Sequence, residues 1–229
     1  MRTSAQHCNG AQGIYSRSGA AYDRLFHDIL RVHQPVVDLV KHRQYVTGPN
    51  MRILDAGCGS GMFTKAIISD AQKRNINSCE YFAFDLTPEM LTRFQHWIND
   101  HDTLPQINLS QGDVLQCQDL LHRWQNMDLV VSCGMLEYLG EDFENGVANL
   151  MEFLRPGGKL VLVLVKDGLL TRNLMESWGA RGFSTDHVEA VFRKLGWQFR
   201  QQPFPGPFFS LSNAMNITNV VYEVTKCGG

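Results

Sequence analysis

The chain lacks long hydrophobic runs, an excess of charge of either sign and any cluster of cysteines. Its longest purely aliphatic run, residues 160–165, is far shorter than the roughly 20 apolar residues of a membrane-spanning helix. Residues 1–7 contain no apolar segment of the kind found in signal peptides. A formal net charge of −2 provides no broad basic face. We therefore expect a cytoplasmic protein with neither a membrane nor DNA as a partner.

The cysteines are scattered, and none belongs to a C-x-x-C pair. This spacing is typical of reduced thiols in the cytoplasm, which are more often buried filler than ligands. Histidines and aspartates between residues 96 and 102 end a predicted helix on its outer face and lack a third convergent ligand, so we expect no metal. The six cysteines are Cys8, Cys58, Cys79, Cys117, Cys133 and Cys227.

No repeat, low-complexity tract or Pro/Gly-rich linker marks a boundary between domains. A chain of 229 residues can bury one good core, so residues 1–229 are expected to form a single domain. Residues 1–13 are polar and are expected to be disordered, whereas 14–48 should form a helical cap. Within residues 20–43, Pro35 is the expected break between two helices.

The most informative run present is residues 53–61, where an apolar strand leads into three alternate glycines. Glycine at such a turn permits positive φ and lets a ligand approach the backbone closely. The dinucleotide-binding fingerprint G-x-G-x-x-G would need its third glycine three places after Gly59, where Met62 stands, so that fingerprint is excluded. Asp55, at the end of the strand, suits a ligand whose nearby end carries an ammonium group. The glycines are Gly57, Gly59 and Gly61.

Further segments follow in the order expected of a sheet in which strands alternate with helices. Asp85 ends a second strand 24 residues after Gly61, near the roughly 20 residues at which such folds place a ribose-binding carboxylate. Thr87 and Pro88 then have the residue types of a helix N-cap and first helical position. The other segments are residues 111–114, 128–133 and 153–160.

Together these segments resemble the motifs of the class I S-adenosylmethionine-dependent methyltransferases over residues 14–226. The resemblance implies an α/β, Rossmann-like, doubly wound domain with seven strands in the order 3-2-1-4-5-7-6, of which strand 7 is antiparallel. It also implies S-adenosylmethionine as cofactor. The last two strands are expected at residues 197–204 and 217–224, as antiparallel neighbours whose connection is too short for a crossover helix.

The resemblance also implies which residues bind the cofactor. Asp55 and the backbone of Gly57 would hold the methionine ammonium group, and Asp85 would accept from both ribose hydroxyls. Leu86 and Met90 would pack on the adenine faces, although Met90 is equally well explained as core filler. The remaining implied residues are Gly59 and Gly61 in the turn, Asp113 and the Val114 backbone at the adenine edge, Cys133 at the end of the fourth strand, and Tyr15, Arg17 and Tyr22 closing the site from the N-terminal segment.

Two of these assignments have simpler alternatives. Asp113 could be a helix cap or a solvated turn residue, and Tyr22 could pack an amphipathic helix on the sheet.

The methyl acceptor is expected beyond the fourth strand. Residues 132–135 lack the N/D-P-P-Y/F motif of enzymes that methylate base amino groups or glutamine amides, which argues against those acceptors. Glu137 and Tyr138 are candidate catalytic residues, although a solvated position in a first helical turn is favoured for Glu137. His187 is a candidate general base, but a histidine at a helix start is more often a surface residue.

The least family-like stretches are residues 166–183 and 203–213, which are candidate substrate lids. Their aromatic content predicts a small acceptor with an apolar or aromatic body. Arg172 or Arg181 could bind a carboxylate or phenolate on it, and a solvated position is the alternative for either arginine. The alternatives are that these aromatics roof the core or form a contact in a homodimer. Two rival functions stay open: methylation of protein or RNA, and a non-catalytic, cofactor-binding partner subunit. The lid aromatics are Trp178, Phe204, Phe208 and Phe209.

Overall fold

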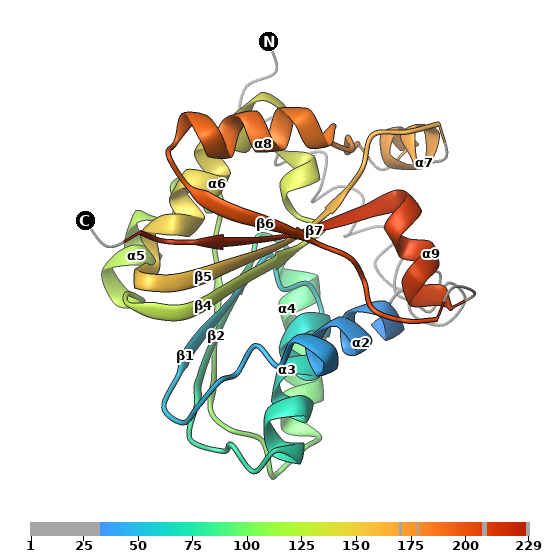
Figure 1. Cartoon of the computed structure of the whole chain (residues 1–229). Helices are drawn as coiled ribbons and strands as arrows, with labels where there is room; N and C mark the ends of the chain where they lie inside the picture. Colours follow the sequence, from blue (N-terminus) through green and yellow to red (C-terminus); the bar gives the residue numbers. More distant parts are fainter. Residues whose placement is uncertain (1–32, 170, 178, 208–209, 228–229) are drawn as a thin grey trace.

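A computed structural model describes residues 33–169, 171–177, 179–207 and 210–227. Its strands are β1 (Arg52–Ala56), β2 (Glu80–Asp85), β3 (Ile107–Gln111), β4 (Met127–Cys133), β5 (Leu154–Val165), β6 (Gln198–Gln202) and β7 (Asn219–Thr225). They form one sheet in the order β3-β2-β1-β4-β5-β7-β6 (Figure 1). Strand β7 is antiparallel to both of its neighbours, while β1 to β5 pair in parallel. The predicted fold class and strand order are confirmed.

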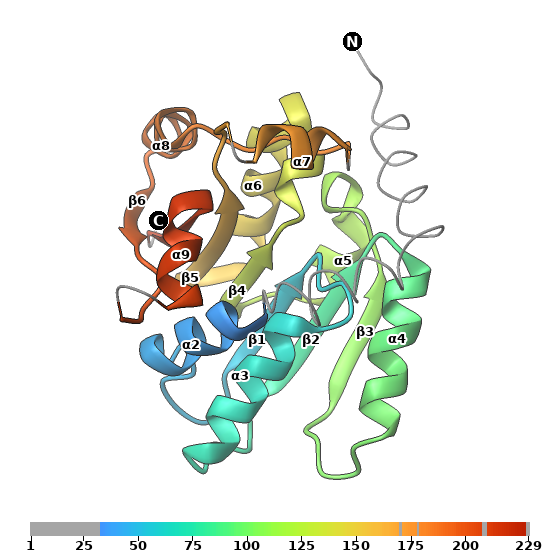
Figure 2. The same cartoon turned by 90° about the vertical axis from the view of Figure 1, so that its right-hand side faces the viewer.

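Helices cover both faces of this sheet (Figures 1 and 2). On one face lie α2 (His33–Arg43), α3 (Met62–Lys73) and α4 (Pro88–Asn99), and on the other lie α5 (Gln118–Arg123), α6 (Phe143–Glu152) and α8 (Thr185–Lys194). The remaining helices are α7 (Arg172–Ser177), α9 (Leu211–Thr218) and the short 3₁₀ turns η2 (Val114–Gln116), η3 (Leu136–Tyr138) and η4 (Gly140–Asp142). No helix in the described ranges is long and apolar enough to cross a bilayer.

The central strands are apolar on both faces because both faces are covered by helices. In β4, Leu129 and Val131 enter the core on the α3 side, while Val130 enters the core on the α6 side. Successive residues of a strand point to opposite faces, so β1 places Asp55 on the α3 side, in line with Ile53. The sheet therefore directs the side chain of Asp55 toward the start of α3.

The connection between β6 and β7 differs from the prediction. It contains the helix α9, and β7 begins at Asn219 rather than at residue 217. The Ser210 hydroxyl caps α9 by accepting a hydrogen bond from the backbone N–H of Asn213 at 3.0 Å. The Ser212 hydroxyl donates to Asp38 of α2 at 2.5 Å, which holds α9 beside α2. The antiparallel pairing of the two strands is nevertheless confirmed.

The predicted N-terminal cap is described from residue 33 onward. Pro35 lies within α2, which continues past it to Arg43, so Pro35 does not end that helix. Helix α2 packs against α3 through the buried residues Val36 and Leu39. Residues 1–32, including the predicted disordered segment, lie outside the described residues.

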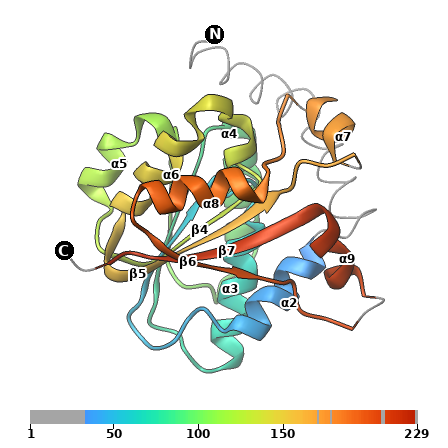
Figure 3. The same ribbon diagram turned by 45° about the horizontal axis from the view of Figure 1, so that its top comes forward.

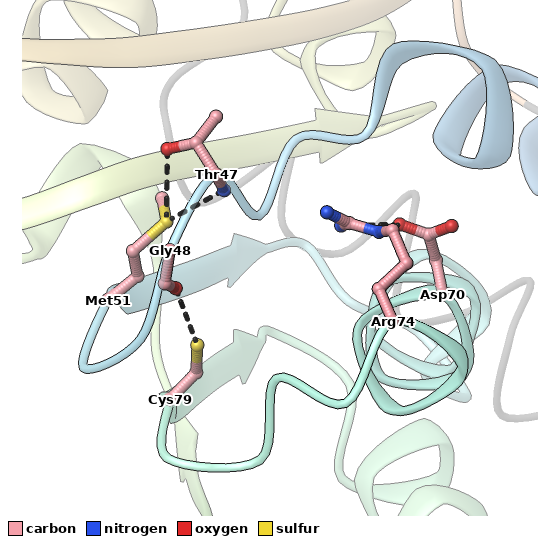
Figure 4. A network of polar contacts seen from close by, with 6 residues as sticks. All are labelled: Thr47, Gly48, Met51, Asp70, Arg74 and Cys79. Atoms are coloured by element: carbon pink, nitrogen blue, oxygen red, sulfur yellow. Dashed lines mark hydrogen bonds and ion pairs between the residues drawn. The ribbon is translucent and has the colours of Figure 1, made fainter.

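Local contacts hold the loops at the amino ends of β1 and β2 (Figure 4). The backbone N–H and hydroxyl of Thr47 lie 3.2 and 3.6 Å from the Met51 sulfur, and the Cys79 thiol lies 3.7 Å from the carbonyl oxygen of Gly48. Ligands of doubly wound folds bind at the opposite, carboxyl ends of the strands. We therefore interpret this network as structural.

Candidate functional site

The carboxyl ends of β1 and β2 are tied together at the glycine turn. The backbone N–H groups of Gly57 and Cys58 both donate to the carbonyl oxygen of Phe84, at 2.9 and 3.0 Å. The three alternate glycines have φ values of 71°, 54° and 88°, as predicted for this turn. The turn therefore has a defined shape that side-chain-bearing residues would strain.

Close packing explains two of these glycines. A Cβ atom at Gly57 would lie 2.5 Å from the side chain of Met135, and one at Gly61 would lie 2.4 Å from the ring of Phe94. Gly61 is also the N-cap of α3, in a left-handed conformation. The structure thus gives Gly57 and Gly61 packing roles within the protein.

Gly59 requires a different explanation, because a Cβ atom there would meet no described atom within 4 Å. The same holds for Gly134, which follows β4, the sheet neighbour of β1, and has a φ of 70°. Two glycines at neighbouring strand ends thus face space that no atom of the described residues fills. Such a cradle fits a ligand that lies against the backbone, as expected for S-adenosylmethionine.

Substituting Gly59 by alanine should separate folding from ligand binding. We expect the free energy of unfolding to fall by roughly 1–2 kcal/mol, because alanine is strained at positive φ. Cofactor affinity should fall by about tenfold or more, because the new methyl group would enter the cradle. Gly196→Ala is the matched control, since Gly196 also has positive φ and open space but lies after α8. Equal cofactor affinity in the two variants, measured by calorimetry, would contradict this reading.

Asp85 lies between the glycine turn and the start of α4. One carboxylate oxygen accepts from the N–H of Gly59 and the other from the N–H of Thr87, both at 2.8 Å. Burial raises the pKa of Asp85, and these backbone donors oppose that shift. Each oxygen retains a further lone pair for a ligand donor. The carboxylate is thus fixed in place while keeping the capacity to accept ligand hydroxyls.

Asp55 has a structural role that the sequence analysis missed. Its Oδ2 accepts from the N–H and the hydroxyl of Thr64, at 3.1 and 2.7 Å, and so caps α3, whose N-cap glycine has no side chain. Oδ1 has no hydrogen-bond partner within the described part of the chain. Burial raises the pKa of Asp55 to about 6. A nearby ligand ammonium group would favour its ionised form.

The adenine-side candidates lie at the starts of α4 and η2. Met90 is buried and Leu86 half-buried. Asp113 accepts a hydrogen bond from the N–H of Leu115 at 2.9 Å and so caps η2. The structure therefore shows the helix-cap role that was the alternative to adenine binding. The carbonyl oxygen of Val114 accepts from Asn149 at 2.8 Å, whereas its N–H donates to no described residue. That N–H is therefore available to a ring nitrogen.

The expectation that Glu137 is solvated is wrong, since only 1% of its surface is exposed. The turn η3 directs its side chain back to the end of β5, where Oε1 accepts from the N–H of Val165 at 2.7 Å. Oε2 is buried without a partner among the described residues. Burial raises the pKa of Glu137 to about 7. The available sequence signal was a single charge inside the otherwise apolar run of residues 135–139.

The other candidates near the acceptor side occupy different surroundings. Tyr138 is half-buried in η3. His187 is exposed in the first turn of α8, and its ring centre lies 5.9 Å from that of Phe143. Cys133 is half-buried at the edge of the α3-side core, and burial raises the pKa of its thiol, which disfavours a thiolate nucleophile.

Only part of each predicted lid is described. Phe204 was expected to face the acceptor, but it is 2% exposed and packs in the α3-side core. It therefore has the alternative role, that of roofing the core. Lid residues 166–183 form α7 and return to β5, where the N–H of Phe183 donates to Val165 at 2.8 Å. The other predicted site residues lie outside the described residues, namely Tyr15, Arg17, Tyr22, Trp178, Phe208 and Phe209.

Residues 53–158 match the family described as "Methyltransferase domain". A curated relative from Shewanella sp. (strain W3-18-1), named carboxy-S-adenosyl-L-methionine synthase, is 35% identical over 115 residues. That match covers 50% of this chain and 44% of the relative, so the chain spans less than half the length of the relatives it matches.

Solved structures with low sequence identity share the fold. A putative methyltransferase from Haloferax volcanii, in complex with the activator Trm112, has a TM-score of 0.69 at 17% identity, over 96% of this chain and 98% of that one. The N-methyltransferase NodS from Bradyrhizobium japonicum WM9, in complex with S-adenosyl-L-homocysteine, has a TM-score of 0.58 at 18% identity, over 86% of both chains.

Proposed function

We propose that this chain, which belongs to the family of class I S-adenosylmethionine-dependent methyltransferases, transfers the methyl group of that cofactor to a small-molecule acceptor. The observation that carries the proposal is the open cradle at Gly59 and Gly134, beside the fixed carboxylate of Asp85. The nearly neutral chain favours a small molecule over RNA as acceptor.

In this proposal, residues at the strand ends and in the N-terminal segment each take one part of the cofactor. Oδ1 of Asp55 and the backbone of Gly57 accept and position the methionine ammonium group, and Asp85 accepts from the ribose hydroxyls. Leu86 and Met90 would pack against the adenine ring. The remaining contacts in the proposal are Asp113 and the Val114 N–H at the adenine edge, Gly59 and Gly61 in the turn, Cys133 at the end of β4, and Tyr15, Arg17 and Tyr22 from the N-terminal segment.

The cofactor supplies a methyl group on a sulfonium, which is a good leaving group. The protein's main task is then to hold the donor and the acceptor in line. The chain does this with rigid elements, since the cradle glycines follow strands and Asp85 is held by two backbone donors. We propose that the acceptor carries an apolar or aromatic body, because the lid segments include Trp178, Phe208 and Phe209.

The test is transfer from methyl-labelled S-adenosylmethionine to a metabolite extract, to histone-like peptides and to transfer RNA. We expect S-adenosylhomocysteine to form and label to appear in small molecules. Labelling of only peptide or RNA would show the proposed acceptor class to be wrong. No labelling, with cofactor binding intact, would favour the non-catalytic subunit. A product heavier than the cofactor by a carboxyl group would instead indicate the reaction named for the Shewanella relatives.

If positioning dominates catalysis, His187 should contribute little. We expect His187→Gln to lower turnover by less than the roughly 100-fold loss typical of removing a true general base. His122→Gln, on the exposed face of α5, is the control. A larger loss that grows as the pH falls, with folding and cofactor affinity intact, would overturn this prediction and indicate a hydroxyl acceptor.

A further inference from the structure

Described residues between 167 and 182 line an open surface pocket of about 340 Å³, and its charged side chains, Arg181 among them, are exposed to solvent. The segment leaves β5, forms α7 and returns toward α8 (Figure 3). Four ionisable side chains contribute to the lining, which presents charged groups beside apolar surface. The lining residues are Asp167, Arg172, Glu176, Arg181 and Gly182.

Backbone contacts fix the cavity to the ends of two central strands. Phe183 forms a bridge with Lys166, and its carbonyl oxygen accepts from the N–H of Asp167 at 2.9 Å. A Cβ atom at Gly182 would lie 2.7 Å from the Lys166 backbone, so this close approach requires glycine. The N–H of Arg181 donates to the carbonyl oxygen of Glu137 at 3.0 Å. Arg181 is therefore anchored to the turn that follows β4, where we expect the acceptor.

The two arginines of the cavity are in different electrostatic situations. The Arg172 guanidinium donates to the Asp167 carboxylate at 3.0 to 3.2 Å. Asp167 and, more weakly, Glu176 raise the pKa of Arg172, so both carboxylates of the cavity act on this one arginine. The Arg181 guanidinium makes no ion pair or side-chain hydrogen bond with any described residue. Arg181 is thus the cation that the cavity leaves available.

We propose that Arg181 binds a carboxylate group of the methyl acceptor, an inference that rests on the proposed function. A guanidinium presents a planar fork of donors that matches the two oxygens of a carboxylate. A cavity of this volume falls in the range that holds small organic ligands. The acceptor is then a small carboxylic acid whose charged end lies under α7 and whose methylated atom lies toward the end of β4.

The first test compares benzoate with benzamide, which have the same shape but differ in charge. Titration calorimetry at constant ionic strength should show benzoate binding about tenfold more tightly than benzamide, since hydrogen bonds to charged groups contribute roughly 1.5–3 kcal/mol. Arg181→Gln should abolish this preference. Arg200→Gln, which removes an exposed arginine of β6, should retain it.

A second variant tests the same site by a change that should strengthen benzoate binding rather than weaken it. Glu176→Gln removes a negative charge from the cavity wall and should tighten benzoate binding several-fold while leaving benzamide binding unchanged. The inference would be overturned if the wild type bound the two probes equally or bound neither. It would also be overturned if Arg200→Gln lost the benzoate preference as Arg181→Gln does, or if Glu176→Gln bound benzoate more weakly.

Cofactor titrations keep this inference separate from the proposed function. S-adenosylmethionine should bind the Arg181→Gln and Arg200→Gln variants as it binds the wild type. Normal cofactor binding with no benzoate preference overturns only the carboxylate site. Absence of cofactor binding by the wild type overturns the proposed function, whatever the benzoate result.

Discussion

Replacing Asp85 by alanine is expected to weaken S-adenosylmethionine binding by about 2–4 kcal/mol, the largest loss expected for any single cofactor contact. The carboxylate would accept two charge-assisted hydrogen bonds from the ribose, and alanine leaves both hydroxyls without an acceptor. The substitution also releases the N–H groups of Gly59 and Thr87, so the glycine turn would lose its connection to the start of α4. Calorimetric titration with the cofactor measures the effect.

Folding must be measured alongside affinity, because Asp85 also supports the turn. Denaturant unfolding of Asp85→Ala reports that structural contribution, and Asp102→Ala in the exposed turn after α4 is the matched control. An unchanged dissociation constant for folded Asp85→Ala would refute the ribose assignment. Micromolar binding of nicotinamide dinucleotides by the wild type would contradict the interpretation of the glycine turn itself.

Replacing Glu137 by glutamine is expected to stabilise the protein more at pH 8 than at pH 5. The difference in free energy of unfolding between variant and wild type should grow by about 2–3 kcal/mol between these two pH values. The pKa of Glu137 is raised from 4.5 to about 7, so the folded state holds a proton that the unfolded chain releases. That contribution to stability is fully present below pH 4.5 and is lost as the pH rises through 7. Glutamine cannot ionise and can still accept from the N–H of Val165.

Urea unfolding of both proteins between pH 5 and pH 8 measures this difference. The wild type should lose stability relative to Glu137→Gln as the pH rises, while the exposed Glu141→Gln should follow the wild type at every pH. Other titrating groups, such as Asp55, are common to all three proteins and cancel in the comparison. Parallel curves for the wild type and Glu137→Gln would show that the buried carboxyl keeps an ordinary pKa.

The sheet and the glycine turn could be predicted because their signals are local. Asp55 and Asp85 end apolar strands, and the alternate glycines follow directly, so a few adjacent residues indicate both the strand ends and the turn. The strand order, which the structure confirms, was predicted from the resemblance to a family. The spacing of residues in the sequence does not by itself show which distant strands are neighbours in a sheet.

The missed features depend on contacts between distant segments. The burial of Glu137 follows from a 3₁₀ turn that directs it to Val165, 28 positions away in the chain. Helix α9 is held by Ser212 on Asp38, and Phe204 packs in a core assembled from α2 and α3. The capping role of Asp55 arose because Gly61, at the start of α3, has no side chain. In each case the position of the residue depends on a contact with a segment distant in sequence, or on the absence of a side chain at a neighbouring glycine.

The segment that carries α7 is attached through backbone hydrogen bonds and through a few buried side chains. The bonds that join Asp167, Arg181 and Phe183 to their neighbours use N–H and carbonyl groups, which every residue except proline supplies in full. Side-chain identity is constrained at Gly182 by its close approach to Lys166, at Phe183 by its packing against Phe143, and at Thr171 by the bond from its hydroxyl to the Lys166 carbonyl oxygen. The outward side chains of α7 are thus free to diverge by mutation without disturbing the sheet. We therefore expect the exposed positions of α7, such as Arg172 and Glu176, to be the natural place to redesign acceptor specificity.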